Sequence, residues 1–191
     1  MVSVSSGTIT GGMDWGSTAN YPLPQTVNAF YIGETEITYE LWYTIKTWAA
    51  GNGYTFANPG REGKGGLEGA APTPAKNEPV TSISWRDAVV WCNAYSETGG
   101  KDPVYKNSGM VLRTTLDADS ADIGSTANSR GLYDMSGNVG EWCQDMDSGS
   151  SRVYRGGSWN TYAVNCEVAN RVSAFPGLIA NTVGLRVACS Q

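Results

Sequence analysis

The chain contains 191 residues, carries a net charge of −5 and has no histidine. This length suits a single domain with a substantial core. The acidic balance argues against a nucleic-acid partner, because a phosphate-binding face is normally basic. Without histidine, a Ser-His-Asp triad, a Cys-His pair, His-ligated zinc and imidazole general-base chemistry are all excluded.

Short strands and one helix are predicted near the start of the chain. Residues 2–5 and 8–10 alternate like short strands, and residues 27–32 indicate a third that residues 34–37 could continue. Thr38 offers a side-chain oxygen that can cap a helix, and Gly51 and Gly53 can end it. The apolar residues between them have helical spacing and form the predicted core face, which is Leu41, Trp42, Ile45, Trp48 and Ala49.

A second helix is predicted after a long loop. Residues 57–79 are rich in Gly, Pro, Ala and charge without periodicity, which is typical of a surface loop. Ser84 and Asp87 have the spacing of a capping box, and Gly99 and Gly100 end the helix. One face of this helix is expected to be core, and it comprises Trp85, Ala88, Val89, Cys92 and Tyr95.

Beyond residue 101 the sequence favours short strands and glycine turns over helices. The best strand candidates are residues 104–105, 111–112 and 183–189. Two early helices followed by a turn-rich strand region predict an α+β fold. The 24 glycines, 7 tryptophans and 10 tyrosines agree with this, because they suit many tight turns held by large aromatic side chains.

The cysteines and the hydropathy pattern narrow the remaining classes. None of the cysteines forms a C-x-x-C pair, which argues against zinc and thioredoxin-type sites and leaves disulfide pairing open for Cys92, Cys143, Cys166 and Cys189. No run of about 18 apolar residues occurs, so no direct membrane span is expected. The first residues lack the basic and apolar regions of a signal peptide.

Five segments, taken together and in this order, resemble one known family. They are FYIGETEIT at 30–38, PVTSISWRDA at 79–88, GLYDMSGNVGEW at 131–142, YRGGSW at 154–159 and GLRV at 184–187. Their order is that of the formylglycine-generating-enzyme/sulfatase-modifying-factor family, and the resemblance covers nearly the whole chain. It implies a single α+β domain over residues 1–191 with a C-type-lectin-like fold, two helices, short strands and little regular secondary structure.

The chain departs from that family at two places. The stretch that usually follows the second helix, Arg-Leu-Pro-Thr-Glu-Ala-Glu-Trp-Glu, is replaced by the shorter residues 107–130, which puts a calcium site usually found there in doubt. The oxidase members carry two cysteines after Gly-Gly-Ser, and here those positions hold Thr161 and Cys166. A lone thiol cannot supply the two-thiolate copper site of those enzymes, so we expect no catalytic residues and no copper. Members that use iron with histidine ligands are disfavoured for lack of histidine.

The resemblance also implies a structural calcium ion. Its ligands would be the side chains of Asp134 and Glu141 and the backbone carbonyls of Gly137 and Val139. Hard oxygen ligands of this kind suit Ca²⁺, and the ion would pin a loop with little regular hydrogen bonding. The alternative is a solvated turn with an exposed carboxylate pair.

Residues 160–183 lie between two family segments and read as a ligand-binding region. The apolar stretch at 175–179 contains Pro176 and Gly177, so it is predicted to be a loop, and exposed apolar side chains on a loop usually indicate binding. This arrangement resembles the variable proteins of diversity-generating retroelements, a subgroup that includes a treponemal variable lipoprotein and viral and archaeal relatives. In that subgroup, adenine-directed mutagenesis scatters substitutions over a C-terminal lectin-like face. Of the residue types that adenine changes in an Asn codon cannot produce, only Glu167 occurs in this segment.

The predicted binding face interleaves with predicted scaffold positions. The scaffold comprises Trp159, Cys166, Val168, Arg171 and Gly184, because a variable site needs a backbone fixed by other residues. Tyr162 and Phe175 are the expected energetic anchors. The binding face comprises Thr161, Tyr162, Val164, Val172, Ser173, Ala174, Phe175, Gly177, Leu178, Ile179, Ala180 and Thr182.

Three functions are consistent with these features. The favoured one is a non-enzymatic, receptor- or adhesin-like protein that displays a diversifiable face to a protein ligand or a host-cell surface receptor. It would act at a cell or virion surface, with any anchor or leader outside this sequence. The alternatives are a cysteine-dependent oxidase and a structural accessory domain, the latter if residues 160–183 are buried. No calcium-sugar motif is present, so no carbohydrate ligand is predicted.

Overall fold

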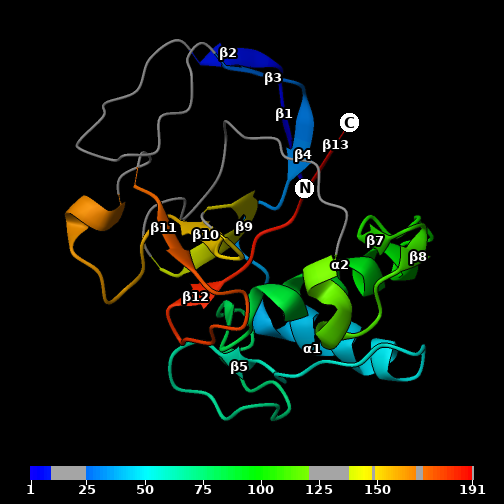
Figure 1. The fold of residues 1–191 in the computed structure, drawn as a ribbon. Coiled ribbons are helices and arrows are strands. Elements are labelled where there is room, and N and C mark those ends of the chain that lie inside the picture. Colours follow the sequence, from blue (N-terminus) through cyan, green and yellow to red (C-terminus); the bar gives the residue numbers. More distant parts are fainter. Residues whose placement is uncertain (10–24, 121–137, 148, 167–169, 191) are drawn as a thin grey trace.

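The structure, a computed structural model, describes residues 1–9, 25–120, 138–147, 149–166 and 170–190. Two helices pack against each other at one side of the domain, and short strands joined by turns and loops make up the remainder (Figure 1). This is the predicted α+β, C-type-lectin-like architecture. Within the described residues, no helix combines the length and hydropathy needed to cross a membrane.

A three-stranded sheet joins the two ends of the chain. Its central strand, β4 (Phe30–Ile32), pairs antiparallel with β1 (Val2–Val4) and β13 (Ala188–Ser190). Ile32 lies opposite both Val2 and Ala188, so the N- and C-terminal segments lie on either side of one strand (Figure 1). The predicted strand at 27–32 is therefore wrong in extent, because residues 25–27 form β3 (Gln25–Val27), which pairs with β2 (Gly7–Ile9). Residues 34–36 bend instead of continuing β4.

A four-stranded sheet carries the C-terminal segment. Its order is β11-β10-β9-β12, with β10 antiparallel to both neighbours and β12 parallel to β9. The strands are β9 (Gly140–Met146), β10 (Arg152–Arg155), β11 (Val172–Ala174) and β12 (Val183–Gly184). The predicted strand at 183–189 is two strands in different sheets, since β12 pairs with β9 and β13 pairs with β4.

Helix α1 (Tyr39–Ala50) begins and ends as predicted. The Thr38 side chain accepts a hydrogen bond from the Leu41 backbone nitrogen at 3.3 Å, and Gly51 caps the other end. Trp42 is fully buried and stacks on Trp91 with ring centroids 5.6 Å apart. Leu41 and Trp48, which were assigned to the core face, are only half-buried, whereas Tyr39 is fully buried.

Helix α2 (Trp85–Thr98) has the predicted capping box between Ser84 and Asp87. The predicted core face is too narrow, because the helix is covered on more than one side. Trp91 and Ala94 are fully buried, while the predicted core residues Cys92 and Tyr95 are half-buried. Contacts with α1 and with the short 3₁₀ helix η1 (Thr115–Ser120) account for this wider burial.

The segment at 57–79 is only partly a surface loop. It contains β5 (Arg61–Glu62), which pairs antiparallel with β6 (Val80–Thr81). Glu62 is buried, and its carboxylate accepts hydrogen bonds from the backbone nitrogen of Thr73 at 2.9 Å and from its hydroxyl at 2.5 Å. A similar short pair, β7 (Lys106–Asn107) with β8 (Met110–Val111), forms a hairpin close to the strands predicted at 104–105 and 111–112.

Candidate functional site

The C-terminal segment begins where β10 ends. Gly156 and Gly157 both have positive φ, at 93° and 69°, so the chain turns sharply there. The bare Cα of Gly157 also permits close packing, since a Cβ at that position would lie 2.6 Å from the Cys166 sulfur. The turn leads towards the 3₁₀ helix η2 (Ala163–Cys166), whose last two residues pack closely against Gly157.

The structure brings together the two positions at which the oxidase members carry cysteines. The Thr161 Oγ1 lies 3.6 Å from the Cys166 sulfur. The same hydroxyl accepts a hydrogen bond from the Ser158 backbone nitrogen at 2.8 Å and donates to the Ser158 carbonyl at 2.9 Å. A threonine hydroxyl contains no sulfur, so it can provide neither a thiolate ligand nor half of a disulfide. The pair therefore supplies a single thiol, from Cys166, while Thr161 stabilises the local turn.

The other described thiols do not contribute to this site. Cys92 and Cys143 are free, as is Cys166. Burial raises the pKa of the Cys92 and Cys143 thiols to about 12, so both remain protonated at neutral pH and are poor nucleophiles. The side chain of Cys189 lies outside the described part of the structure.

The predicted binding face is exposed in part. Tyr162 is 84% exposed and Phe175 is 59% exposed, in agreement with their expected role as accessible anchors. Ile179 and Val172 are also exposed large apolar residues. The smaller polar side chains of Thr161 and Ser173 are exposed as well. Binding through this face stays a prediction, because exposure alone does not identify a ligand.

Other members of the predicted face have mixed or structural positions. Ala174, Leu178 and Ala180 are half-buried and pack against the hydrophobic core, so they support the segment more than they display it. Gly177 and Thr182 are half-buried. The side chain of Val164 lies outside the described part of the structure.

A fixed backbone underlies the exposed side chains. Arg171 forms an ion pair with Asp147, and the Ser173 hydroxyl donates to the Asp147 Oδ2 at 2.7 Å, so a residue following β9 holds β11 in place. The loop after β11 is anchored too, since the Ser82 backbone nitrogen donates to the Ala180 carbonyl at 2.9 Å. Arg171 and the buried Gly184 therefore occupy the scaffold positions predicted for them, and the side chain of Val168 is outside the described residues.

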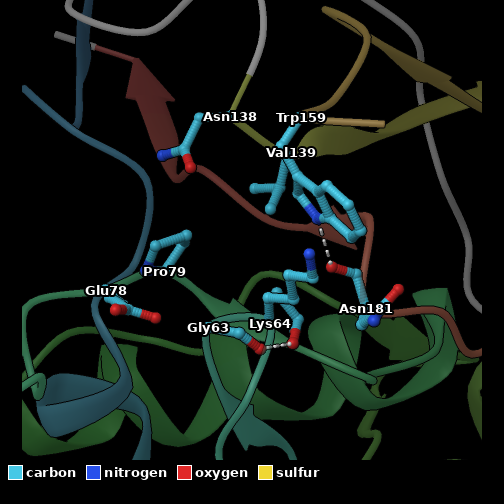
Figure 2. Close-up of a pocket in the computed structure, with 9 residues that line it drawn as sticks. Gly63, Lys64, Glu78, Pro79, Asn138, Val139, Trp159 and Asn181 are labelled. Atoms are coloured by element: carbon cyan, nitrogen blue, oxygen red, sulfur yellow. Dashed lines mark hydrogen bonds between the residues drawn. The ribbon is translucent and has the colours of Figure 1, made fainter. Parts of the chain in front are cut away.

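Trp159 combines scaffold and surface roles. Its backbone nitrogen donates to the Asn138 carbonyl at 2.8 Å, and its indole nitrogen donates to the Asn181 carbonyl at 3.2 Å. The ring is nevertheless 42% exposed and borders a shallow pocket of about 300 Å³ (Figure 2). Sequence reasoning missed this pocket, because Lys64, Glu78 and Trp159 come from separate segments that only the fold brings together.

The predicted calcium ligands are only partly within the described residues. Asp134 and Gly137 lie outside them, Val139 is buried, and the Glu141 carboxylate accepts from the Arg186 Nε at 2.7 Å. Over the described ranges, no three Asp, Glu, Cys or His side chains cluster closely enough to hold a metal ion. The Glu141 carboxylate is thus paired with Arg186, and a bound calcium ion would have to share the carboxylate with that arginine. The ion itself stays a prediction.

A family model for the sulfatase-modifying factor enzyme 1-like domain matches residues 1–121 and 117–191. The chain belongs to this family. A formylglycine-generating enzyme from Thermomonospora curvata is 27% identical over 180 residues, which cover 63% of this chain and 58% of that protein. The serine/threonine-protein kinase Pkn1 of Chlamydia trachomatis is 39% identical over 77 residues, which cover 30% of this chain and only 12% of the kinase.

Solved structures of similar fold extend over nearly the whole sulfatase-modifying-factor domain. CarF has a TM-score of 0.77 at 22% identity, with 100% of this chain and 97% of that chain covered. Treponema denticola variable protein 1 has a TM-score of 0.74 at 24% identity, with 99% and 94% covered. PvdO from Pseudomonas aeruginosa has a TM-score of 0.61 at 20% identity, with 98% and 92% covered. These similarities establish a shared fold.

Proposed function

We propose that this domain is a non-enzymatic, receptor- or adhesin-like binding protein whose C-terminal face is diversified by a retroelement. The observation that carries the proposal is the contact between the Thr161 hydroxyl and the Cys166 sulfur. It places a single thiol where the oxidase members of the family need two, so the segment is free to serve binding instead of chemistry. The shared fold with a treponemal variable protein agrees with this reading.

The surface that follows Trp159 suits recognition of a protein. Tyr162, Phe175 and Ile179 expose large apolar side chains, and aromatic residues of this kind supply much contact area at low entropic cost. The backbone of this segment is held from outside the face at Ala180, whose carbonyl accepts from the Ser82 backbone nitrogen, and the Asp147 carboxylate holds the Arg171 and Ser173 side chains. Many different side chains can therefore be displayed without unfolding the domain.

The partner proposed for this face is a protein ligand or a host-cell surface receptor, encountered at a cell or virion surface. The net charge of −5 argues against a nucleic-acid partner. A structural calcium ion held by Asp134, Glu141 and the carbonyls of Gly137 and Val139 is part of the same proposal, because it would stiffen the support beneath the face.

The coding DNA tests diversification directly. We expect a near-repeat of the 3′ end of the coding sequence beside a reverse-transcriptase gene, with differences confined to adenines of the repeat. A genomic neighbourhood without both features would remove the retroelement from the proposal while leaving the binding function in place.

A paired library tests whether the face is built to vary. One library randomises the exposed positions Tyr162, Val172, Phe175 and Ile179 together, and the control library randomises an equal number of buried core positions. We expect most members of the first library to unfold at close to the wild-type temperature and most members of the second to be unfolded, since surface substitutions usually change stability by less than about 0.5 kcal/mol each. Equal loss of folding in both libraries would contradict a displayed face.

Oxygen uptake tests the competing oxidase function. We expect no copper-dependent oxygen consumption with a cysteine-containing peptide, either in the wild-type protein or in the matched Cys166→Ser variant. The Thr161→Cys variant restores the family's pair of thiols and serves as the positive comparison for metal binding. Wild-type oxygen consumption that disappears in Cys166→Ser would overturn the non-enzymatic proposal.

A further inference from the structure

Two opposite charges, Lys64 and Glu78, lie just beyond one end of the β5–β6 ladder. Arg61 pairs with Thr81 and Glu62 with Val80, and the Gly63 backbone nitrogen donates to the Pro79 carbonyl at 3.0 Å. The chain turns at residues 63–65, so Lys64 follows the end of β5 and Glu78 precedes β6 at the same end of the ladder. Oppositely charged side chains on neighbouring segments normally attract each other and form a pair.

Here the two charges are held apart. The Lys64 ammonium lies over the Trp159 ring, 3.9 Å from its centroid. The Glu78 carboxylate lies over the Cα of Gly63, where a Cβ would collide with it. Among the ion pairs of the described residues, neither Lys64 nor Glu78 takes part. Each charge therefore lacks a counter-charge within 4 Å in the described structure.

The space around these two charges is the pocket beneath Trp159. Figure 2 shows the Lys64 and Glu78 side chains at separate places along its edge, with the indole ring and Val139 above them. The Trp159 ring, Val139 and Pro79 give apolar walls, and the volume of about 300 Å³ is at the small end of the range for ligand sites. A ligand here would be small and would meet one cation and one anion.

We propose that this pocket binds a free α-amino acid as a zwitterion. Its carboxylate would pair with the Lys64 ammonium and its ammonium with the Glu78 carboxylate, while its side chain would contact the Trp159 ring. A ligand with a single charge would gain one of these contacts and leave the other protein charge without a partner, whereas a zwitterion satisfies both. Both charges belong to the β5–β6 region. Asn181 of the C-terminal segment also lines the pocket, but none of the residues of the proposed binding face does.

Binding is measured by isothermal titration with the twenty free L-amino acids, one at a time, on the full chain. For the tightest binder, two analogues remove one charge each: the amide lacks the carboxylate, and the N-acetyl derivative lacks the ammonium. We expect each analogue to bind at least about tenfold more weakly than the parent, because each loses a charge-assisted contact. Binding by none of the twenty, or equal affinity for parent and analogues, would overturn the proposal.

Two substitutions assign the contacts. Lys64→Met should weaken the parent amino acid about tenfold and leave the weak affinity for the amide unchanged. Glu78→Gln should likewise weaken binding of the parent amino acid about tenfold and leave the weak affinity for the N-acetyl derivative unchanged. The controls Lys101→Met and Glu68→Gln change exposed charges that do not line the pocket, and we expect wild-type affinities from both. Loss of affinity in the controls equal to that in the test variants would contradict the assignment. Failure of any of these tests leaves the C-terminal binding face untouched.

Discussion

Asp87 is predicted to be the single polar side chain on which the helical half of the domain depends most. Its carboxylate is fully buried and accepts six hydrogen bonds. The Oδ1 atom accepts from the backbone nitrogens of Ala57 and Asn58 and from the Thr115 hydroxyl, at 3.0–3.2 Å. The Oδ2 atom accepts from the Asn58 amide at 2.6 Å and from the Ser84 backbone nitrogen and hydroxyl, at 3.0 and 2.6 Å. One side chain thus joins the start of α2 to the loop before β5 and to η1.

The Asp87→Asn substitution keeps the shape of this side chain but replaces one acceptor oxygen with an NH₂ group, which can only donate. An amide NH₂ on either side would face three donors, so those donors would lose their acceptor inside the core. An unsatisfied buried donor costs about 1–3 kcal/mol, and breaking a buried charged network typically costs about 3–5 kcal/mol in total. For a domain of this size, we expect a loss of about 4 kcal/mol in the free energy of unfolding and a fall of roughly 10 °C in Tm.

Urea unfolding at pH 7, followed by tryptophan fluorescence, measures this loss. The matched control is Asp117→Asn, which makes the same chemical change at an exposed position of η1. We expect the control to change the free energy of unfolding by less than about 0.5 kcal/mol. A loss below about 1 kcal/mol for Asp87→Asn would refute the reasoning, because the six contacts would then be replaceable by solvent or by rearrangement.

Three further predictions concern the face, the metal and the thiols. Tyr162→Ala, at an 84% exposed position, should lower the free energy of unfolding by less than about 0.5 kcal/mol in the same urea assay. Trp142→Ala, at a 7% exposed position, should lower it by about 3–5 kcal/mol. Similar losses for the two variants would contradict the division into face and support. Calcium added after chelation should raise Tm more than magnesium does, and Glu141→Gln should abolish the difference; an identical response to both ions would remove the calcium site. Burial raises the pKa of the Cys92 and Cys143 thiols from 9.0 to about 12. Between pH 9 and pH 12 the folded state therefore binds more protons than the unfolded state. The free energy of unfolding should therefore be unaffected by these thiols below pH 9 and fall as pH rises from 9 towards 12, as urea titrations at several pH values would show. Iodoacetamide at pH 8 should accordingly modify both half-buried thiols only slowly in the folded protein, and rapid modification would contradict their raised pKa.

Local signals in the sequence identified the helices well, because helix ends are decided by neighbouring residues. Thr38 and Ser84 cap α1 and α2 as predicted, since a cap needs only a side-chain oxygen three residues before a free backbone nitrogen. Burial of α2 was predicted less well. Trp91 and Ala94 are buried by contacts from elements distant in sequence, and no periodicity within the helix reveals how many sides will be covered.

The candidate site divides in the same way. The sequence alone determined the family segments, the replacement of one cysteine by Thr161 and the exposure expected for Tyr162 and Phe175, because each depends on residue identity and local spacing. Only the tertiary structure decided that β12 and β13 belong to different sheets and that the Lys64 ammonium lies over the Trp159 ring. Contacts of that kind join segments far apart along the chain, so they depend on how the strands pair and the turns close, which residue pattern alone does not determine.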